Sequence, residues 1–424
     1  MLDIKFIREN PQKVKDACIK KNLNGEVVEE ILELDIKRRN LLTSLENLRA
    51  KQNRFTEQEI EKAKENKAEI KKLEPEVKEA EEKLQKLVFD LPNVPLEGVP
   101  VGKDESENVV LRKVGVLPKF TFQPKDHLEL GEMLDIIDTK TASVVSGARF
   151  AYLKNEAAMI QFALVQLALS VLTSPAQMKK IADSVGVNRK VFSPVVPPVM
   201  IKPDVYTRMA RLSEQDKTEK YYIQSDDVYL IGSAEHTLGP LHIDEVVAEN
   251  RLPLRYVGYS TSFRREAGSY GKDTKGILRM HQFDKVEMES FTKPEDSAKE
   301  QDFFVAIQEY LLKLLGIPYQ VMIVCTGDMG KPDARQIDIE CWVPSQNRYR
   351  ETHSADLMTD FQARRLNIRY RDKAGKVNFV HTLNGTAFAI GRILIMIMEN
   401  YQQKNGSIKV PKALRKYCGF KIIK

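Results

Sequence analysis

The chain is poor in cysteine and has no long apolar run. Its 424 residues include four cysteines, scattered without a CxxC pair. This spacing argues against a disulfide framework or a cysteine zinc site, and it indicates a reducing, cytoplasmic location. No apolar run approaches the roughly 20 residues of a membrane span. The start of the chain, MLDIKFIREN, lacks the apolar segment of a signal peptide, so we expect neither a leader nor a membrane segment.

Several catalytic motifs are also missing. There is no GxxxxGK[ST] and no strand-linked GxGxxG, which excludes the two commonest nucleotide-binding folds in their usual form. The six histidines form no HExxH or other metal spacing. Without GxSxG or a Cys–His signature, covalent catalysis has no obvious centre. The chemistry must therefore reside in polar clusters of another kind.

Charge is abundant but nearly balanced. Charged residues make up 30% of the chain, above the usual quarter or so, which indicates a long solvated helical element. The net charge of +6 allows a polyanionic partner without requiring one. A chain of this length is too long for one ordinary domain, so we expect two.

Residues 27–91 carry the clearest periodic pattern, with apolar residues at alternating spacings of four and three, as in a coiled coil. The pattern comprises Val27, Ile31, Leu34, Leu41, Leu45, Leu48 and Phe55, then Ala63, Ile70, Leu73, Val77, Ala80, Leu84, Leu87 and Leu91. Each residue of the first half has a counterpart in the second half, and the two residue numbers always add up to 118, as for Val27 and Leu91. The pattern therefore predicts an antiparallel helical hairpin with its tip near 59, in which Gln52 faces Asn66. Pro75 lies off the seam, where we expect a kink rather than a helix end.

The use of this arm is open at this stage. A coiled coil most often serves as a spacer or for oligomerisation. The first helix, however, is strongly basic between residues 37 and 54, which favours contact with a phosphate backbone. The candidate contacts are Arg38, Arg39, Arg49, Lys51 and Arg54.

A Pro- and Gly-rich linker follows the arm, and from residue 105 strands alternate with amphipathic helices. We expect strands at 195–201, 229–232 and 254–263, and helices near 128–138, 155–172, 299–315 and 385–401. Because hairpins as well as helices join the strands, the pattern predicts an α+β fold with a mostly antiparallel sheet. The predicted domains are 1–104, containing the arm, and 105–424.

Four polar clusters in the second half of the chain could carry chemistry: Gly232–Glu235, residues 262–289, Arg350–Ser354 and His381–Thr386. Residues 262–289 predict a hairpin whose glycines (Gly268, Gly271, Gly276) suit a long loop. Its polar residues are Arg264, Arg265, Glu266, Arg279, Phe283 and Glu287. Guanidinium groups suit phosphate, a ring suits a base, and a carboxylate suits an ammonium group, so a nucleotide site is favoured over a solvated hairpin. In the last cluster, Asn384-Gly385-Thr386 ends a strand and precedes an apolar helix with Arg392 about two turns in. That arginine either reaches solvent at the helix margin or has an anionic partner.

These residues resemble the bacterial type of seryl-tRNA synthetase over the whole chain. The similar strings are MLDIKFIRENPQKV, the arm ending in LPN and VPVGKDESEN, VFSPVVPPVM as class II motif 1, FRREAGSYGKDTKGILRMHQFDKVE as motif 2, WVPSQNRYRE, TDFQARRLNIRYR, and HTLNGTAFAIGRILIMIMENYQ as motif 3. The resemblance implies a class II antiparallel sheet flanked by helices, preceded by a tRNA-binding helical hairpin.

The resemblance also implies a reaction and its residues. L-Serine and ATP would give seryl-adenylate, and serine would then pass to tRNA(Ser), and in the family also to tRNA(Sec). The implied ATP site is Arg264, Arg265, Glu266, Arg279, Phe283, Glu351, Thr352, His353, Ser354 and Arg392, with Arg264, Glu351 and Arg392 as catalytic residues. The implied serine site is Ser233, Ala234, Glu235, Arg264, Glu287, Asn384 and Thr386. Glu351 and Ser354 would ligate Mg²⁺, no zinc is expected, and Pro198 would lie at a homodimer interface.

Three departures from the family pattern stand out. Ser233 replaces a usual Thr, and Arg265 replaces a usual Ser or Thr. The stretch 352–358 reads THSADLM where the family tends to be small and Cys-rich, so Asp356 could alter the metal site. The alternative hypothesis is a catalytically inactive synthetase-like adaptor that binds tRNA or nucleotide through its arm.

Overall fold

The computed structural model describes residues 1–214, 216–267 and 276–424. Gly268 and Gly271, predicted to shape the hairpin loop, lie outside these residues.

Contacts divide the chain into two compact units, Met1–Pro95 and Leu96–Lys424. The division falls nine residues before the predicted boundary at 104/105 because the intervening segment packs on the second unit. The Leu96 N–H donates to the Ala334 carbonyl at 2.8 Å, and the Gly102 N–H lies 3.4 Å from Thr326 Oγ1.

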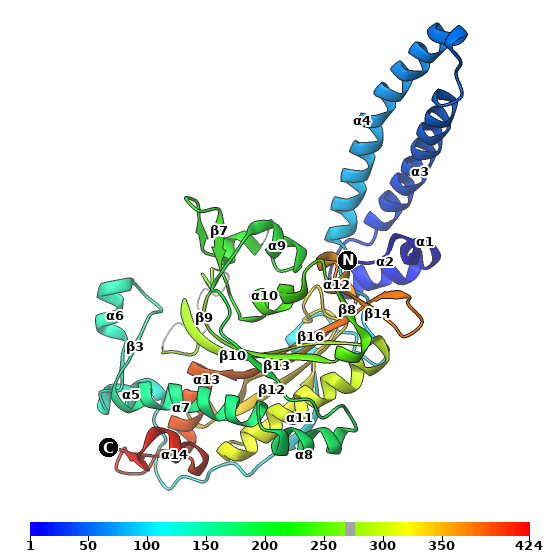
Figure 1. The fold of residues 1–424 in the computed structure, drawn as a ribbon. Helices are drawn as coiled ribbons and strands as arrows, with labels where there is room; N and C mark the ends of the chain where they lie inside the picture. Colours follow the sequence, from blue (N-terminus) through cyan, green and yellow to red (C-terminus); the bar gives the residue numbers. More distant parts are fainter. Residues whose placement is uncertain (215, 268–275) are drawn as a thin grey trace. The chain divides into compact units, whose positions relative to one another are not determined.

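The first unit is entirely helical (Figure 1). Its elements are α1 (Ile4–Glu9), α2 (Pro11–Lys20), α3 (Val27–Gln52), the short 3₁₀ helix η1 (Glu57–Glu59) and α4 (Ile60–Asp90). The antiparallel pairing of α3 and α4 confirms the predicted hairpin, and α4 continues through Pro75. At the seam, the side-chain amide of Asn66 donates to Gln52 Oε1 at 2.8 Å and to the Leu48 carbonyl at 2.9 Å. The two polar seam residues therefore meet as the numbering predicts.

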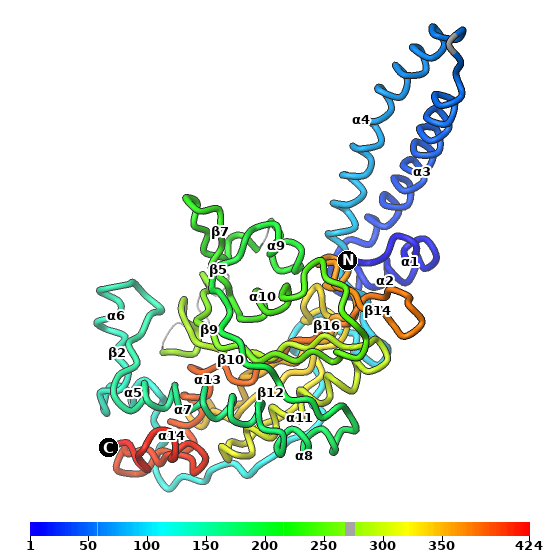
Figure 2. Tube along the Cα trace, viewed as in Figure 1, coloured from blue at the N-terminus to red at the C-terminus, as the bar shows by residue number. Residues whose placement is uncertain are grey.

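The second unit is built on a sheet that has eight strands among the described residues. In spatial order they are β1 (Val109–Val114), β11 (Tyr319–Ile323), β12 (Arg335–Val343), β13 (Arg348–Thr359), β16 (His381–Ala389), β10 (Gln282–Thr292), β9 (Leu254–Phe263) and β4 (Ser193–Val195). Every neighbouring pair is antiparallel except β4 and β9. The predicted α+β class with a mostly antiparallel sheet is confirmed. Figure 2 shows β10 and β16 side by side, although about 90 residues separate them in sequence.

Smaller strands and helices surround this sheet. The strands are β2 (Ile137–Asp138), β3 (Tyr152–Leu153), β5 (Met200–Ile201), β6 (Tyr222–Ile223), β7 (Val228–Leu230), β8 (Val246–Ala248), β14 (Arg369–Arg371), β15 (Val377–Phe379), β17 (Ile408–Lys409) and β18 (Ile422–Ile423). The helices are α5 (His127–Met133), α6 (Thr139–Ser146), α7 (Asn155–Leu172), α8 (Pro175–Val185), α9 (Pro203–Arg208), α10 (Glu235–Leu238), α11 (Ser297–Leu315), α12 (Phe361–Leu366), α13 (Ile390–Tyr401) and α14 (Arg415–Cys418).

The main core lies between one face of the sheet and helices α7, α11 and α13, while α9 and α10 lie over the opposite face (Figure 1). Fully buried side chains such as Phe304 and Ile393 fill it, and each contributes roughly 1.5–3 kcal/mol through burial. In the described part of the chain, α7 is the one helix long and apolar enough to cross a membrane. Half of it is buried in this core, which accounts for its composition.

Three sequence predictions need correction. The helix expected near 128–138 ends at Met133, and Ile137–Asp138 form strand β2, which pairs with β3. The helix expected from 385 begins at Ile390, because β16 continues to Ala389 through pairs such as Met288 with Gly385. Arg392 therefore lies in the first turn of α13 rather than two turns in. The strand expected over 195–201 is two short strands, β4 and β5, since Pro197 and Pro198 cannot donate ladder hydrogen bonds.

Candidate active site

A cavity of about 300 Å³ lies in the second unit, where the hairpin strands, β13 and β16 meet the start of α13. Its lining residues are Arg264, Glu266, Ile277, Leu278, Arg279, Met280, Phe283, Lys285, Gln336, Glu351, Thr352, Ser354, Thr386, Ala389, Gly391 and Arg392. Nine of these belong to the predicted ATP and serine sets. The cavity therefore joins residues that lie up to 128 positions apart in the chain.

Arg264 follows directly after β9 and is held on two sides. Its Nε donates to the Gly232 carbonyl at 3.0 Å, and its guanidinium carbon lies 5.3 Å from the centre of the Phe283 ring. Among the described residues no acid pairs with it. Since a guanidinium group keeps its charge, Arg264 presents a fixed cation to the cavity.

The two sides of the hairpin are joined by an ion pair at the cavity wall. Arg279 Nη1 lies 3.2 Å from Glu266 Oε2. The Glu266 backbone adopts a left-handed φ of 51°, which is uncommon for this residue type, and its carbonyl accepts from Arg149 Nη1 at 2.8 Å. The carboxylate is thus held in place, and the Phe283 ring lines the same cavity.

A second ion pair in the cavity lining joins Glu351 and Arg392. Arg392 Nη1 donates to the Glu351 carbonyl at 2.9 Å and lies 3.1 Å from Glu351 Oε1. Although desolvation favours the protonated acid, Arg392 and Arg264 hold the pKa of Glu351 below its usual range. Glu351 is therefore an anion under ordinary conditions.

The residues near Glu351 fit a hard cation such as Mg²⁺. Across the ladder, Glu351 pairs with Glu340 and Ser354 with Asp338, so oxygen donors gather on neighbouring strands. Within the described residues, no group of three or more His, Cys, Asp or Glu side chains could hold a metal. Magnesium commonly binds through one or two carboxylates plus substrate phosphates, so this sparse donor set suits it.

Three predicted ATP residues lie less favourably. His353 is fully buried, its Nδ1 is 2.8 Å from Thr352 Oγ1, and burial lowers its pKa to about 3. It does not line the cavity, so a nucleotide there would not reach its ring. Thr352 lines the cavity, but its hydroxyl is engaged with the Ile339 carbonyl at 3.2 Å. Arg265 is exposed and lies outside the lining.

Most of the predicted serine residues are buried. Ser233, Ala234, Glu235, Glu287 and Asn384 are all buried, and Thr386 links this group to the cavity because it lines the cavity and pairs with Glu287 across β10 and β16. Glu287 is fully buried, and its Oε1 has no hydrogen-bond partner among the described residues. Burial raises the pKa of Glu287, although a nearby cation opposes this shift.

That cation is Lys285, which sequence reasoning missed. Its Nζ lies 2.6 Å from Glu287 Oε2 and 3.4 Å from Ser233 Oγ, and its side chain also lines the cavity. Lys285 and Glu287 are two positions apart on β10, so their side chains share a face. This alternation was visible in the sequence.

Sequence reasoning also missed a row of buried carboxyl groups on β10 and β13. Glu289 and Asp356 each lie directly opposite Asn384, on β10 and β13 respectively. Arg211 Nε donates to Glu235 Oε1 at 2.8 Å and supplies positive charge to this row. Burial raises the pKa of both Glu289 and Asp356 well above the usual range. The row becomes visible only once the order and register of the strands are known, because Glu289 and Asp356 are far apart in the sequence.

Comparison with known proteins gives a consistent assignment. Residues 1–95 match the seryl-tRNA synthetase N-terminal domain, and residues 217–401 match the tRNA synthetase class II core domain (G, H, P, S and T). The serine–tRNA ligase of Fervidobacterium nodosum is 42% identical over 439 residues, covering 100% of this chain and 99% of that protein. The serine–tRNA ligase of Thermodesulfovibrio yellowstonii is also 42% identical, with 100% of each chain covered. The chain belongs to the seryl-tRNA synthetase family. It is accordingly an ATP-dependent aminoacyl-tRNA ligase, as the resemblance predicts.

Solved structures of the family agree with this fold. Seryl-tRNA synthetase from Pyrococcus horikoshii, solved with ATP, gives a TM-score of 0.91 at 39% identity and covers 100% of this chain and 99% of that one. The cytoplasmic enzyme of Naegleria fowleri, solved with AMP, gives 0.88 at 29% identity, with the same coverage.

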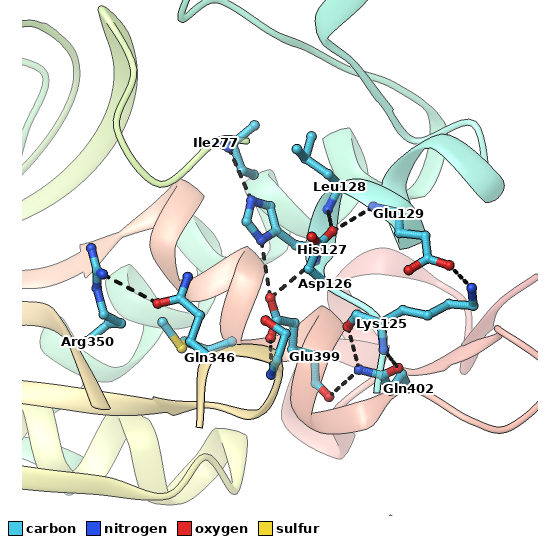
Figure 3. A network of polar contacts seen from close by, with 12 residues as sticks. Lys125, Asp126, His127, Leu128, Glu129, Ile277, Gln346, Arg350, Glu399 and Gln402 are labelled. Atoms are coloured by element: carbon cyan, nitrogen blue, oxygen red, sulfur yellow. Dashed lines mark hydrogen bonds and ion pairs between the residues drawn. The ribbon is translucent and has the colours of Figure 1, made fainter. Parts of the chain in front are cut away.

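In this member of the family, a buried network fixes one edge of the cavity (Figure 3). His127 Nδ1 lies 3.2 Å from Glu399 Oε1, and its Nε2 accepts from the Ile277 N–H at 3.3 Å. Glu399 Oε2 also accepts from the Ser345 N–H at 3.0 Å. The network ties Ile277, which lines the cavity, to the helix that carries Arg392. Neither His127 nor Glu399 was expected from the sequence.

In the family's N-terminal domain, the predicted basic residues divide into two groups. Arg38 and Arg39 lie 3.3 and 3.1 Å from the fully buried Asp35. Arg49 pairs with Glu74 at 2.8 Å. Among the described residues, Lys51 and Arg54 are exposed and pair with no acid. The second group is therefore the more available to a partner.

Proposed function

We propose that this enzyme activates L-serine with ATP and transfers it to the 3′ end of tRNA(Ser), in the cytoplasm. A serine carboxylate oxygen attacks the α-phosphorus, the bond to the β-phosphate bridging oxygen breaks, and pyrophosphate leaves. A terminal ribose hydroxyl then attacks the carbonyl carbon, and AMP leaves. The carboxylate is already an anion, so the first step needs no general base. Positioning and neutralisation of phosphate charge account for the catalysis.

The observation that carries this proposal is a cavity lined by three arginines, which Lys285 links to the buried carboxylate of Glu287. Arg264 would hold the α-phosphate, because its guanidinium is held and has no acid partner among the described residues. Phe283 would stack on adenine, and Glu266 would accept from the adenine amino group. Arg279 and Arg392 would contact the outer phosphates. Each of these two would exchange its present acid partner for phosphate oxygens.

Glu351 and Ser354 would hold Mg²⁺, which when bound neutralises charge on the phosphates. Their exposure to the cavity supports this role. Thr352 would help to shape this wall through its backbone.

Serine would bind among the buried residues around Glu287. Its ammonium group would contact Glu287 and Ser233, and its hydroxyl would contact Thr386. Alanine has the ammonium group but lacks the hydroxyl, so it would leave the buried Thr386 hydroxyl without that partner, and this penalty is the physical basis of selectivity. Ala234, Glu235 and Asn384 would complete the wall.

We further propose a homodimer through the segment around Pro198. Val196 and Met200, on either side of it, are 87% and 50% exposed. Next to them, β4 ends the large sheet. Exposed apolar side chains at a sheet edge favour association. For tRNA, Lys51 and Arg54, together with Arg38, Arg39 and Arg49, would contact the phosphate backbone.

Serine-dependent exchange of pyrophosphate into ATP tests the first step. With Mg²⁺ and ATP saturating, we expect exchange with serine and none above background with alanine. Absence of exchange with serine would favour the alternative, an adaptor that binds tRNA or nucleotide without catalysis. Charging assays with purified tRNA(Ser) and tRNA(Sec) then determine whether the enzyme accepts both.

A further inference from the structure

Lys285 contacts the side chains that the proposed substrate would also contact. Its ammonium group contacts Glu287 Oε2 at 2.6 Å and lies 3.4 Å from Ser233 Oγ. Under the proposed function, the serine ammonium contacts the same two side chains. Lysine and serine both present a primary ammonium group, and one buried carboxylate neutralises only one such charge, so the two compete for Glu287.

Glu287 explains why a cation is needed when the pocket holds no serine. The side chain is fully buried, and an unpaired buried carboxylate is costly. Other charged groups near it are Glu235, which is already paired with Arg211, the buried Glu289, and Arg264, which is held by the Gly232 carbonyl. Lys285 is therefore the cation that contacts it.

The Lys285 ammonium group could also reach a second partner, in the cavity. Its side chain lines the cavity together with Arg264 and Glu351, and it is 12% exposed. A lysine ammonium on a flexible four-carbon stem can change partner more easily than a guanidinium fork. The phosphates of ATP would offer it an anionic partner in that cavity.

We propose that Lys285 is a substrate-displaced cation: it neutralises Glu287 in the free enzyme, and serine binding transfers it to the phosphate cavity, next to the reacting α-phosphate. This inference rests on the proposed function. It makes Lys285 both an occupant of the amino-acid pocket and a phosphate contact in the complex. Because ATP gives the displaced ammonium a partner, ATP and serine must strengthen each other's binding, and linkage makes the effect reciprocal.

The first test uses the unmodified enzyme. Serine affinity is measured by calorimetry with and without a non-hydrolysable ATP analogue. We expect the analogue to tighten serine binding by about tenfold, within the usual range of such couplings. It should not tighten binding of 3-hydroxypropanoate, which lacks the ammonium group and leaves Lys285 on Glu287. Equal tightening of both ligands would overturn the proposal.

The second test uses Lys285→Met and Lys285→Gln. In both variants we expect the coupling between nucleotide and serine to fall below about twofold. Serine should bind no more weakly than in the unmodified enzyme when nucleotide is absent, while the exchange kcat falls. Full coupling in the variants, or much weaker serine binding without nucleotide, would instead indicate a permanent structural ion pair.

Arg279→Met is the matched control, because it removes another cavity cation that does not contact Glu287. This variant should bind nucleotide more weakly, but a saturating nucleotide concentration should tighten serine binding as much as in the unmodified enzyme. The experiments distinguish a failure of the proposed function from a failure of the proposed displacement of Lys285. If the unmodified enzyme shows no serine-dependent exchange, the proposed function is wrong. If exchange occurs and coupling is independent of Lys285, only the displacement is wrong.

Discussion

The helical arm carries most of its charged side chains at the surface, whereas the second unit, Leu96–Lys424, here called the ligase unit, buries several of them. In the arm, pairs such as Arg49 with Glu74 lie at the surface around an apolar seam. In the ligase unit, Glu287, Glu289 and Asp356 are buried near the centre of the sheet. Surface pairs contribute little to stability and are free to exchange partners. Buried acids need a cation or a proton, so their state is tied to whatever binds beside them.

The largest expected effect comes from removing the arm. Deleting residues 37–81 and joining the ends with a short glycine linker leaves the ligase unit intact, since positions 36 and 82 are opposite each other in the hairpin numbering. We expect tRNA charging to fall to background, because phosphate contacts dominate nucleic-acid affinity. Serine-dependent exchange should be unchanged, because the cavity residues all lie in the second unit. Charging at the normal rate would show that the arm is only a spacer.

The same contrast explains what the sequence could predict. Heptads are local, so the seam, the tip and the contact between Gln52 and Asn66 followed from counting. Strand β9 was likewise predicted at Leu254–Phe263 by alternation. The start of α13 was not, because pairing of Gly385 with a distant strand overrides the local helical pattern.

Only the site residues that belong to recognisable motifs were predicted from the sequence. Motif resemblance identified nine residues of the cavity wall, but the row formed by Glu289, Asn384 and Asp356 depends on strand order, which no local pattern specifies. The link from His127 to Ile277 spans 150 positions and has no periodic signal at all.

In the ligase unit, Arg392→Ala tests whether the cavity cations act on the reaction. We expect exchange kcat to fall by about a hundredfold, a typical cost of removing one group that stabilises developing charge. The exposed Arg189, which pairs with Asp183, provides the control, and Arg189→Ala should exchange normally. A loss in Arg392→Ala no larger than in the control would remove this arginine from the catalytic set.

Glu289→Gln tests whether burial keeps an acid protonated. Burial, with Glu235 and Glu287 nearby, raises the pKa of Glu289 well above the usual range. Folding then favours the protonated acid, so its contribution to stability is complete below the unfolded pKa and is lost as pH rises toward the folded pKa. The slope can reach about 1.4 kcal/mol per pH unit. Glutamine cannot ionise, so the variant should gain stability over the unmodified enzyme as pH rises, measured by thermal unfolding across neutral pH.

Glu97→Gln, which removes an exposed carboxylate from the same unit, is the control for Glu289→Gln. It should follow the unmodified enzyme at every pH. If the Glu289→Gln curve also runs parallel to the unmodified one, Glu289 is ionised in the folded state, and the contrast between buried and surface acids is smaller than we infer.

The smallest expected effect concerns the polar pair in the arm. Asn66→Ala removes the hydrogen bonds to Gln52 and to the Leu48 carbonyl, at a cost of about 1 kcal/mol. Amide hydrogen exchange in the full chain should therefore be roughly fivefold faster along α3 and α4 and unchanged in the ligase unit. Asn47→Ala, an exposed change on the same arm, should have no such effect. If both variants exchange alike, the seam pair adds no stability, and the apolar heptads alone hold the two helices in register.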